Sequence, residues 1–130
     1  MFQGLPFFVV FTVMGHFPAA IVLGIYYLLR RRRSEAPARV LHWSDALSVL
    51  LPFWVWVVLV WHTRVGDSKS LSNLGEILWC GWGFSALLAL RAAVALRQRR
   101  LRADLWGYIT LAAVLISIVL LALLVPALPE

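Results

Sequence analysis

Residues 44–95 have the sequence SDALSVLLPFWVWVVLVWHTRVGDSKSLSNLGEILWCGWGFSALLALRAAVA, and this stretch decides the fold. It contains two long apolar runs that flank a short polar segment. A helix rises 1.5 Å per residue, so about 20 apolar residues cross the ~30 Å hydrocarbon core of a bilayer. The runs at 45–62 and 74–95 therefore predict two membrane-spanning helices joined by the loop 63–73.

One more apolar run lies on each side of this hairpin, at 7–29 and 105–125. The chain is 62% hydrophobic and only 14% charged, whereas soluble domains have about 25% charged residues. This composition excludes a water-soluble protein. Residues 1–6 carry no Lys or Arg, unlike the start of a cleaved signal peptide, so the first run is expected to remain as a span. We predict a single transmembrane domain over 1–130, an all-α integral membrane protein with four helices in a bundle.

The charges of the loops predict the orientation. Loop 30–43 carries five arginines and loop 96–104 carries four, whereas loop 63–73 has one arginine and one lysine, and the two ends have none. Basic loops stay on the cytoplasmic side of a membrane. We therefore expect two Arg-rich cytoplasmic loops, with the N- and C-termini and loop 63–73 outside, in the periplasm.

The basic composition also bears on location and partners. Arginine outnumbers lysine eleven to one, a bias typical of GC-rich bacteria, so we expect the bacterial inner membrane. The arginines lie next to the predicted spans and no base-stacking aromatic platform accompanies them, which argues against a nucleic-acid partner. Membrane lipids are expected partners, because a basic residue near an anionic surface contributes about 1 kcal/mol.

His16 lies near the middle of the first predicted span, next to Pro18. A polar side chain at this depth is a functional candidate, for haem ligation, proton relay or substrate binding. The alternative is a neutral imidazole that bonds to a backbone carbonyl. His62 is the second candidate cofactor ligand, but it lies about 10 Å from the centre of its span, so a haem b held by both would be strongly tilted. No bound cofactor is the main expectation, and haem b is the alternative.

Small residues recur at every fourth position in two spans. Gly81, Ser85 and Ala89 form one such stripe, and Gly15 with Ala19 begins another. Small residues let helices approach closely in lipid, where packing rather than exclusion of water drives association. The two stripes either contact each other inside the bundle or bind a partner protein. The second interpretation makes Gly81, Ser85 and Ala89 candidate partner-binding residues.

The loop 63–73 is the only sizeable segment expected outside, and its charged residues are Arg64, Asp67 and Lys69. Glu76 follows at the start of the next span. Asn73 and Glu76 are three residues apart and resemble a capping box, which places the Glu76 carboxylate at a helix N-terminus. These four charged residues are the candidates for recognition at the outer face.

Arg91 lies in the third span, near its cytoplasmic end. A long side chain there is able to extend its guanidinium toward the interface and needs no partner, which is the expected arrangement. If Arg91 faces the bundle instead, Asp45 or Asp104 is the partner.

The second span is rich in tryptophan. Trp54 and Trp56 lie too deep for an interfacial belt and on nearly opposite faces of the helix. At least one of them is therefore expected to pack against another helix or a ligand.

The sequence favours a protein that acts by binding. No catalytic arrangement, phosphate loop or internal repeat stands out, and little chain is left outside the spans to form an active site. We therefore expect a non-enzymatic inner-membrane protein, either an accessory subunit of a membrane complex or an immunity-type or regulatory binder of another membrane protein, or a homo-oligomer. The alternative is an electron-transfer subunit, with haem b or quinone, or a small-solute transport subunit that uses His16.

Overall fold

The computed structural model describes residues 4–34, 36, 38–61, 70–98 and 100–129. These residues form four α-helices and one short 3₁₀ helix, and none of them belongs to a strand. The elements are α1 (Leu5–Arg32), α2 (Ser44–Trp61), η1 (Leu71–Leu74), α3 (Gly75–Gln98) and α4 (Ala103–Leu124). The predicted all-α class and its four helices are confirmed.

Among the described residues, three helical segments are long and apolar enough to cross a membrane. They are α1 with 28 residues, η1 and α3 together with 28 residues, and α4 with 22 residues. The helix α2 is also apolar but shorter, with 18 residues, close to the lower limit of about 17 residues for a spanning helix.

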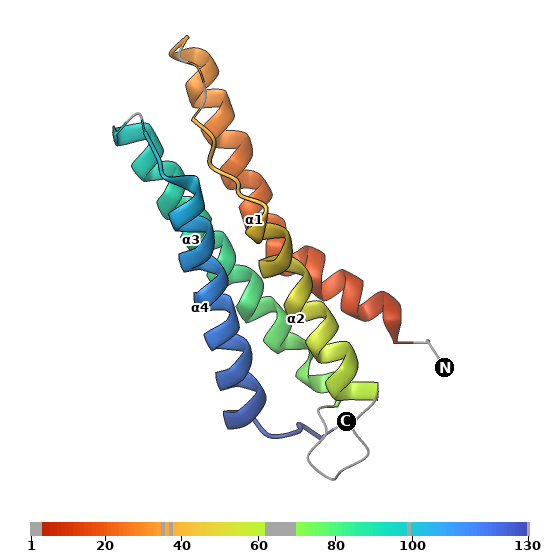
Figure 1. The fold of residues 1–130 in the computed structure, drawn as a ribbon. Coiled ribbons are helices and arrows are strands. Elements are labelled where there is room, and N and C mark those ends of the chain that lie inside the picture. The colour runs from red at the N-terminus through yellow and green to blue at the C-terminus, as the bar shows by residue number, and fades with distance from the viewer. Residues whose placement is uncertain (1–3, 35, 37, 62–69, 99, 130) are drawn as a thin grey trace.

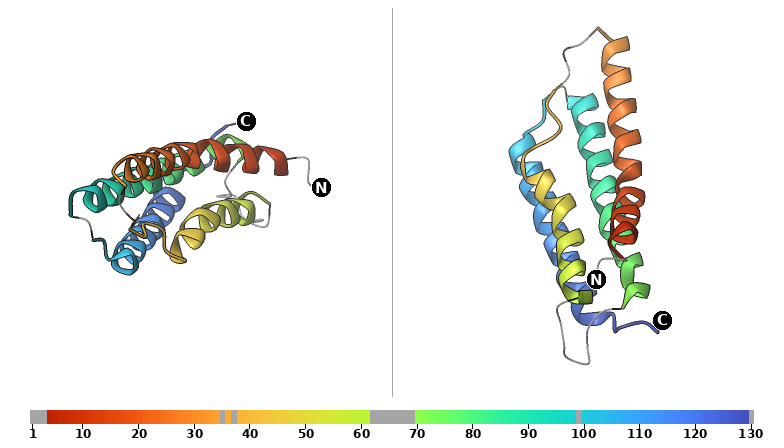
Figure 2. Two further views of the ribbon diagram at one scale, coloured as in Figure 1. Left: turned by 90° about the horizontal axis from the view of Figure 1, so that it is seen from above. Right: turned by 90° about the vertical axis from the view of Figure 1, so that its right-hand side faces the viewer.

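The helices form two layers. α1 packs chiefly against α3, and α2 packs chiefly against α4, as Figure 2 shows in the view from above. Figure 1 shows that α1 changes direction part-way along its length, and Pro18 lies inside this helix. A proline inside a helix removes one backbone donor and bends the helix, which accounts for the change of direction.

The N- and C-terminal ends of the described chain lie at the same end of the bundle (Figure 1). The connections that follow α1 and α3 begin at the opposite end (Figure 1), and the last turns of both helices carry arginines there, namely Arg30, Arg31, Arg32 and Arg97.

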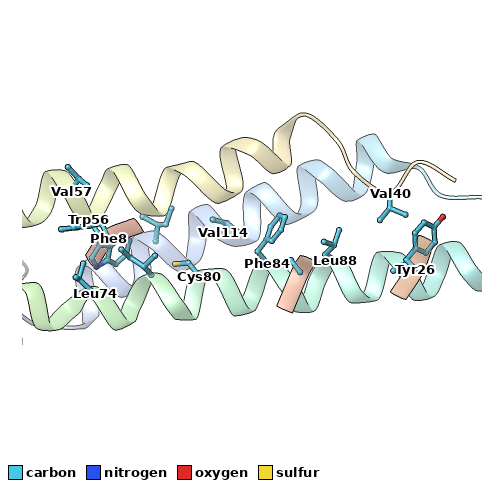
Figure 3. Close-up of a cluster of buried hydrophobic side chains, with 14 of the residues drawn as sticks. Phe8, Tyr26, Val40, Trp56, Val57, Leu74, Cys80, Phe84, Leu88 and Val114 are labelled. Atoms are coloured by element: carbon cyan, nitrogen blue, oxygen red, sulfur yellow. The ribbon is translucent and has the colours of Figure 1, made fainter. Parts of the chain in front are cut away.

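The interior is lined by apolar side chains from all four helices, among them Phe8, Trp56, Phe84, Leu88 and Val114 (Figure 3). The exterior is also apolar, and large hydrophobic side chains are exposed on every helix. Soluble monomers rarely expose large contiguous apolar patches. Surfaces of this kind are typical of helices that face lipid.

Trp54 and Trp56 face different surroundings, as expected from their positions on nearly opposite faces of α2. Trp56 is fully buried in the core, whereas 58% of Trp54 is exposed. The expectation that at least one of the two packs against another helix is confirmed.

The start of α3 differs from the sequence-based prediction. The capping box is formed by Ser70 and Asn73 around η1, rather than by Asn73 and Glu76. The Asn73 side chain instead donates to the Glu76 carboxylate. The difference arises because η1 places the chain in a helical conformation one turn before α3 begins.

Candidate functional site

A buried ion pair joins α2 to α3. The Nη1 and Nη2 atoms of Arg91 donate to Oδ2 and Oδ1 of Asp45 at 2.8 and 2.7 Å. The Arg91 side chain is fully buried, and 7% of the Asp45 side chain is exposed. Two parallel hydrogen bonds between a guanidinium and a carboxylate are the strongest geometry for such a pair and fix the relative rotation of both helices.

The Arg91 guanidinium has two further partners. Nη1 also donates to the carbonyl of Val40, which precedes α2, at 3.2 Å. Nη2 also donates to Thr110 Oγ1 of α4 at 2.5 Å, and the Thr110 hydroxyl in turn donates to the Trp106 carbonyl at 2.8 Å. One side chain of α3 therefore contacts α2, α4 and the segment before α2.

The expectation that Arg91 extends toward the interface is wrong, and the alternative with Asp45 holds. A guanidinium with no exposed surface has no water to solvate it, so it needs a carboxylate and hydrogen-bond acceptors inside the protein. Asp104, the other candidate partner, lies instead on the surface, 4.0 Å from the guanidinium of Arg102.

Local structure at the start of α2 positions the Asp45 carboxylate. Its Oδ2 accepts a hydrogen bond from the backbone N–H of His42 at 2.8 Å, as the third residue of a capping box does. The first turn of α2 lies against α4 at Gly107, where a Cβ atom would stand 2.6 Å from Ser44 Oγ and 2.7 Å from His42 Cβ. Glycine is favoured there because a larger residue would collide with the side chains of Ser44 and His42.

His16 lies on α1, and the structure settles its local partner. Its Nδ1 is 2.8 Å from the carbonyl of Thr12. A carbonyl only accepts, so Nδ1 carries the proton and Nε2 is the free acceptor of the neutral ring. The ring packs beside Phe84, with centroids 5.5 Å apart. Nε2 is buried and has no hydrogen-bond partner among the described residues.

A cavity of about 480 Å³ lies between α1 and α2, and both His16 and Asp45 line it. The structure therefore places His16 and the carboxylate of the ion pair on the lining of one cavity. The second candidate cofactor ligand, His62, lies outside the described residues, so binding of haem b by His16 and His62 stays a prediction. Within the described ranges, no group of three or more His, Cys, Asp or Glu side chains is arranged to hold a metal ion.

The small residues of α3 face α1. A Cβ on Gly81 would lie 2.5 Å from the carbonyl carbon of Gly15, so the two backbones touch. The Ser85 hydroxyl is shared between the carbonyls of Gly81, at 2.8 Å, and Gly15, at 3.4 Å. Gly81 and Ser85 thus contact the α1 stripe at Gly15, inside the bundle. Ala89 is half-buried near the surface.

Beside this contact, a groove of about 430 Å³ runs along the outer side of α1 and α3. It is lined by small and mid-sized side chains around an exposed tryptophan, namely Pro18, Val22, Trp82, Ser85, Ala86 and Ala89. Two residues of the predicted partner-binding stripe, Ser85 and Ala89, therefore border a surface groove.

Of the other candidate recognition residues, Glu76 is described by the structure, and it lies in the first turn of α3. Glu76 is 5% exposed and bonds to Asn73. The Asn73 side chain also binds the tail after α4, because its Nδ2 donates to the Pro126 carbonyl at 3.0 Å and its Oδ1 accepts from the Leu128 N–H at 3.0 Å. Arg64, Asp67 and Lys69 lie outside the described residues, and their role in recognition stays a prediction.

A second buried arginine, Arg30, was missed by the sequence analysis, which placed it among the loop charges. Arg30 is 2% exposed, donates to the Ala95 carbonyl of α3 and lies 5.7 Å from the Tyr26 ring centroid. The Tyr26 hydroxyl donates to the Ala38 carbonyl at 2.9 Å. The cluster of four arginines that begins at Arg30 hides this role, because nothing local distinguishes the first from the next three.

Thr110 was also missed. The sequence signal that could have identified it is a hydroxyl residue in a span with few other polar side chains.

No protein-family model matches the chain, and neither a curated protein nor a solved structure matches it. Its function must therefore be inferred from the geometry described above.

Proposed function

We propose that this protein is a non-enzymatic, four-span protein of the bacterial inner membrane that binds a transmembrane helix of another membrane protein. In this role it serves as an accessory subunit of a complex or as an immunity-type or regulatory binder. The observation that supports the proposal most directly is the groove along α1 and α3, which small residues line and no described segment fills.

The membrane assignment is supported by the surface of all four helices. Side chains such as Phe17, Ile116 and Leu123 are 60% or more exposed, although they are strongly apolar. Polar and charged side chains such as Asp45, Arg91 and Thr110 are inside. This distribution is stable when lipid replaces water as the solvent around the spans. The gathering of arginines at one end supports the orientation with both termini outside.

The chemistry of the groove favours a helix as the occupant. In lipid, helices associate where small residues allow close approach of backbones. Ala86 and Ala89 lie one turn apart on α3 and leave such an approach open, whereas Trp82 stands beside them with 45% of its surface exposed. A partner helix is thereby able to pack into the groove against an aromatic edge.

Groove-filling substitutions test this proposal. Ala86→Leu with Ala89→Leu is expected to abolish co-purification of a partner from the native membrane in mild detergent, followed by mass spectrometry. Ala112→Leu is the matched control, because Ala112 is exposed on α4 and away from the groove. Gly81→Leu is unsuitable, since its side chain would collide with the α1 backbone.

Three outcomes decide the matter. A partner of defined identity that is lost with the groove variant and kept with the Ala112 control supports the proposal. A groove variant that retains every partner, or a wild-type protein that purifies alone, overturns it. A second copy of this chain as the sole partner would replace the hetero-complex with a homo-oligomer.

A second candidate function is supported by the cavity that His16 and Asp45 share. We propose it as a small-solute or electron-carrier site in which the ring of His16 borders the bound molecule. A flux assay in vesicles with wild type and His16→Ala tests solute transport, and an absorption spectrum after expression with haem supplied tests haem b. Unchanged flux and no Soret band would exclude these two versions.

A further inference from the structure

A cavity of about 670 Å³ lies at the Arg-rich end of the bundle. Residues of the last turns of α3, the connection to α4, the first turn of α4 and the segment before α2 line it, and it is open to the surface. This cavity is distinct from the groove proposed to bind a partner helix, which lies along α1 and α3.

The cavity is amphipathic. Its polar wall consists of Gln98, Arg100 and Arg102, and both arginines are exposed, so their guanidinium groups are free to move toward an anion. The nearest carboxylate, Asp104, is 4.0 Å from Arg102, and both side chains are more than half exposed. Such an exposed contact is weak, so it leaves Arg102 available.

The apolar wall consists of Val94, Leu101 and Leu105. A soluble anion would leave these side chains in contact with water. A molecule with an anionic head and a hydrocarbon chain would satisfy both walls at once.

One feature of α4 adds to the match. Trp106 lines the cavity, and tryptophan indoles concentrate at the level of lipid head groups.

We propose that this cavity binds an anionic phospholipid of the cytoplasmic leaflet. The phosphate head group contacts Arg100, Arg102 and Gln98, and the acyl chain lies along Val94, Leu101 and Leu105. The assignment to the cytoplasmic leaflet rests on the orientation given under the proposed function.

Native mass spectrometry of the full-length protein in detergent, titrated with phosphatidylglycerol or phosphatidylcholine, tests this site. Wild type is expected to bind phosphatidylglycerol more tightly. The double variant Arg100→Gln/Arg102→Gln is expected to bind phosphatidylglycerol about 30-fold more weakly, since each basic residue contributes roughly fivefold. The matched control Arg31→Gln/Arg32→Gln removes the same charge from the exposed end of α1 and is expected to keep the wild-type affinity.

A variant of unchanged charge distinguishes binding in this cavity from general electrostatic attraction of the lipid to the protein. Ala38 lines the cavity, so Ala38→Phe is expected to fill it and to remove the bound phosphatidylglycerol peak. Equal weakening by both double variants, full binding by Ala38→Phe, or equal affinity for the two lipids would each overturn the proposal. Displacement of the lipid by millimolar inorganic phosphate would overturn it in favour of a free anion.

The outcome is independent of the partner experiment. If lipid binding is absent but the partner is still captured, the lipid site is overturned and the proposed function stands. Cysteine labelling of the α3–α4 connection from outside whole cells would overturn the orientation, even if the cavity binds lipid in detergent.

Discussion

The guanidinium of Arg91 and the carboxylate of Asp45 face each other through two parallel hydrogen bonds of 2.7 and 2.8 Å. The pair joins the two layers of the bundle, from the first turn of α2 to α3. Replacing such a pair with well-packed apolar residues is often neutral, whereas removing one partner leaves a buried charge and is costly. Because both hydrogen bonds require the Arg91 face of α3 to meet the Asp45 face of α2, the ion pair favours this rotation of the two helices.

Removal of the carboxylate alone tests this role. Asp45→Ala leaves the buried Arg91 charge without a counter-ion, and we expect the free energy of unfolding to fall by about 3–5 kcal/mol. The measurement is unfolding of the detergent-solubilised protein followed by circular dichroism. Asp104→Ala is the control, because Asp104 is exposed and its contact with Arg102 contributes at most about 1 kcal/mol.

Substituting both members of the pair completes this test. Asp45→Leu with Arg91→Met is expected to recover most of the stability, since no charge is left buried. If the double variant is as unstable as Asp45→Ala, the ion pair does more than neutralise Arg91. If Asp45→Ala unfolds like wild type, Arg91 is not buried against Asp45.

Thr110 is predicted to stabilise the same charge from α4. Thr110→Val keeps the shape of the side chain but removes one of the two acceptors for Arg91 Nη2, at a cost of about 1.5–3 kcal/mol for a hydrogen bond to a charged group. Ser117→Ala serves for comparison, because the Ser117 hydroxyl bonds only to the Ala113 carbonyl of its own helix at 2.8 Å. Equal effects of the two substitutions on unfolding would contradict a special role for Thr110.

The contact between Gly15 and Gly81 predicts a steric limit on the α1–α3 interface. Gly81→Ala places a Cβ 2.5 Å from the Gly15 backbone, so the helices must separate, and overpacking of this kind costs about 1–3 kcal/mol. Gly83→Ala is the matched control on the same helix, because its Cβ would meet nothing within 4 Å. Unfolding measurements that rank Gly83→Ala as the more destabilising change would refute the contact.

Asn73 is predicted to hold the tail that follows α4. Asn73→Ala removes the acceptor of the Leu128 N–H, and a hydrogen bond of about 1–1.5 kcal/mol corresponds to roughly tenfold faster amide exchange at Leu128. Hydrogen–deuterium exchange with mass spectrometry checks this. Ser72→Ala removes only an exposed bond to the Pro129 carbonyl and should change exchange at Leu128 little. Equal protection in both variants would show that Asn73 does not hold the tail.

Much of the candidate site was accessible from the sequence only as alternatives. Asp45 was one of two possible partners for Arg91, and the contact of Gly81 with the α1 stripe was one of two uses for small residues. Deciding between them requires the rotation and depth of each helix relative to the others. These depend on packing between segments separated by tens of residues, such as Ser44 against Gly107.

The sequence by itself determined the helical class and the four helices, because long apolar runs are local properties of the chain. It also determined that the arginines would cluster in two connections. Only the tertiary structure decided that Arg91 turns inward to Asp45 and Thr110, and that Asn73 binds the C-terminal tail. A buried charge or amide takes whichever partner the packed helices bring within hydrogen-bond distance, and that proximity exists only after the bundle has formed.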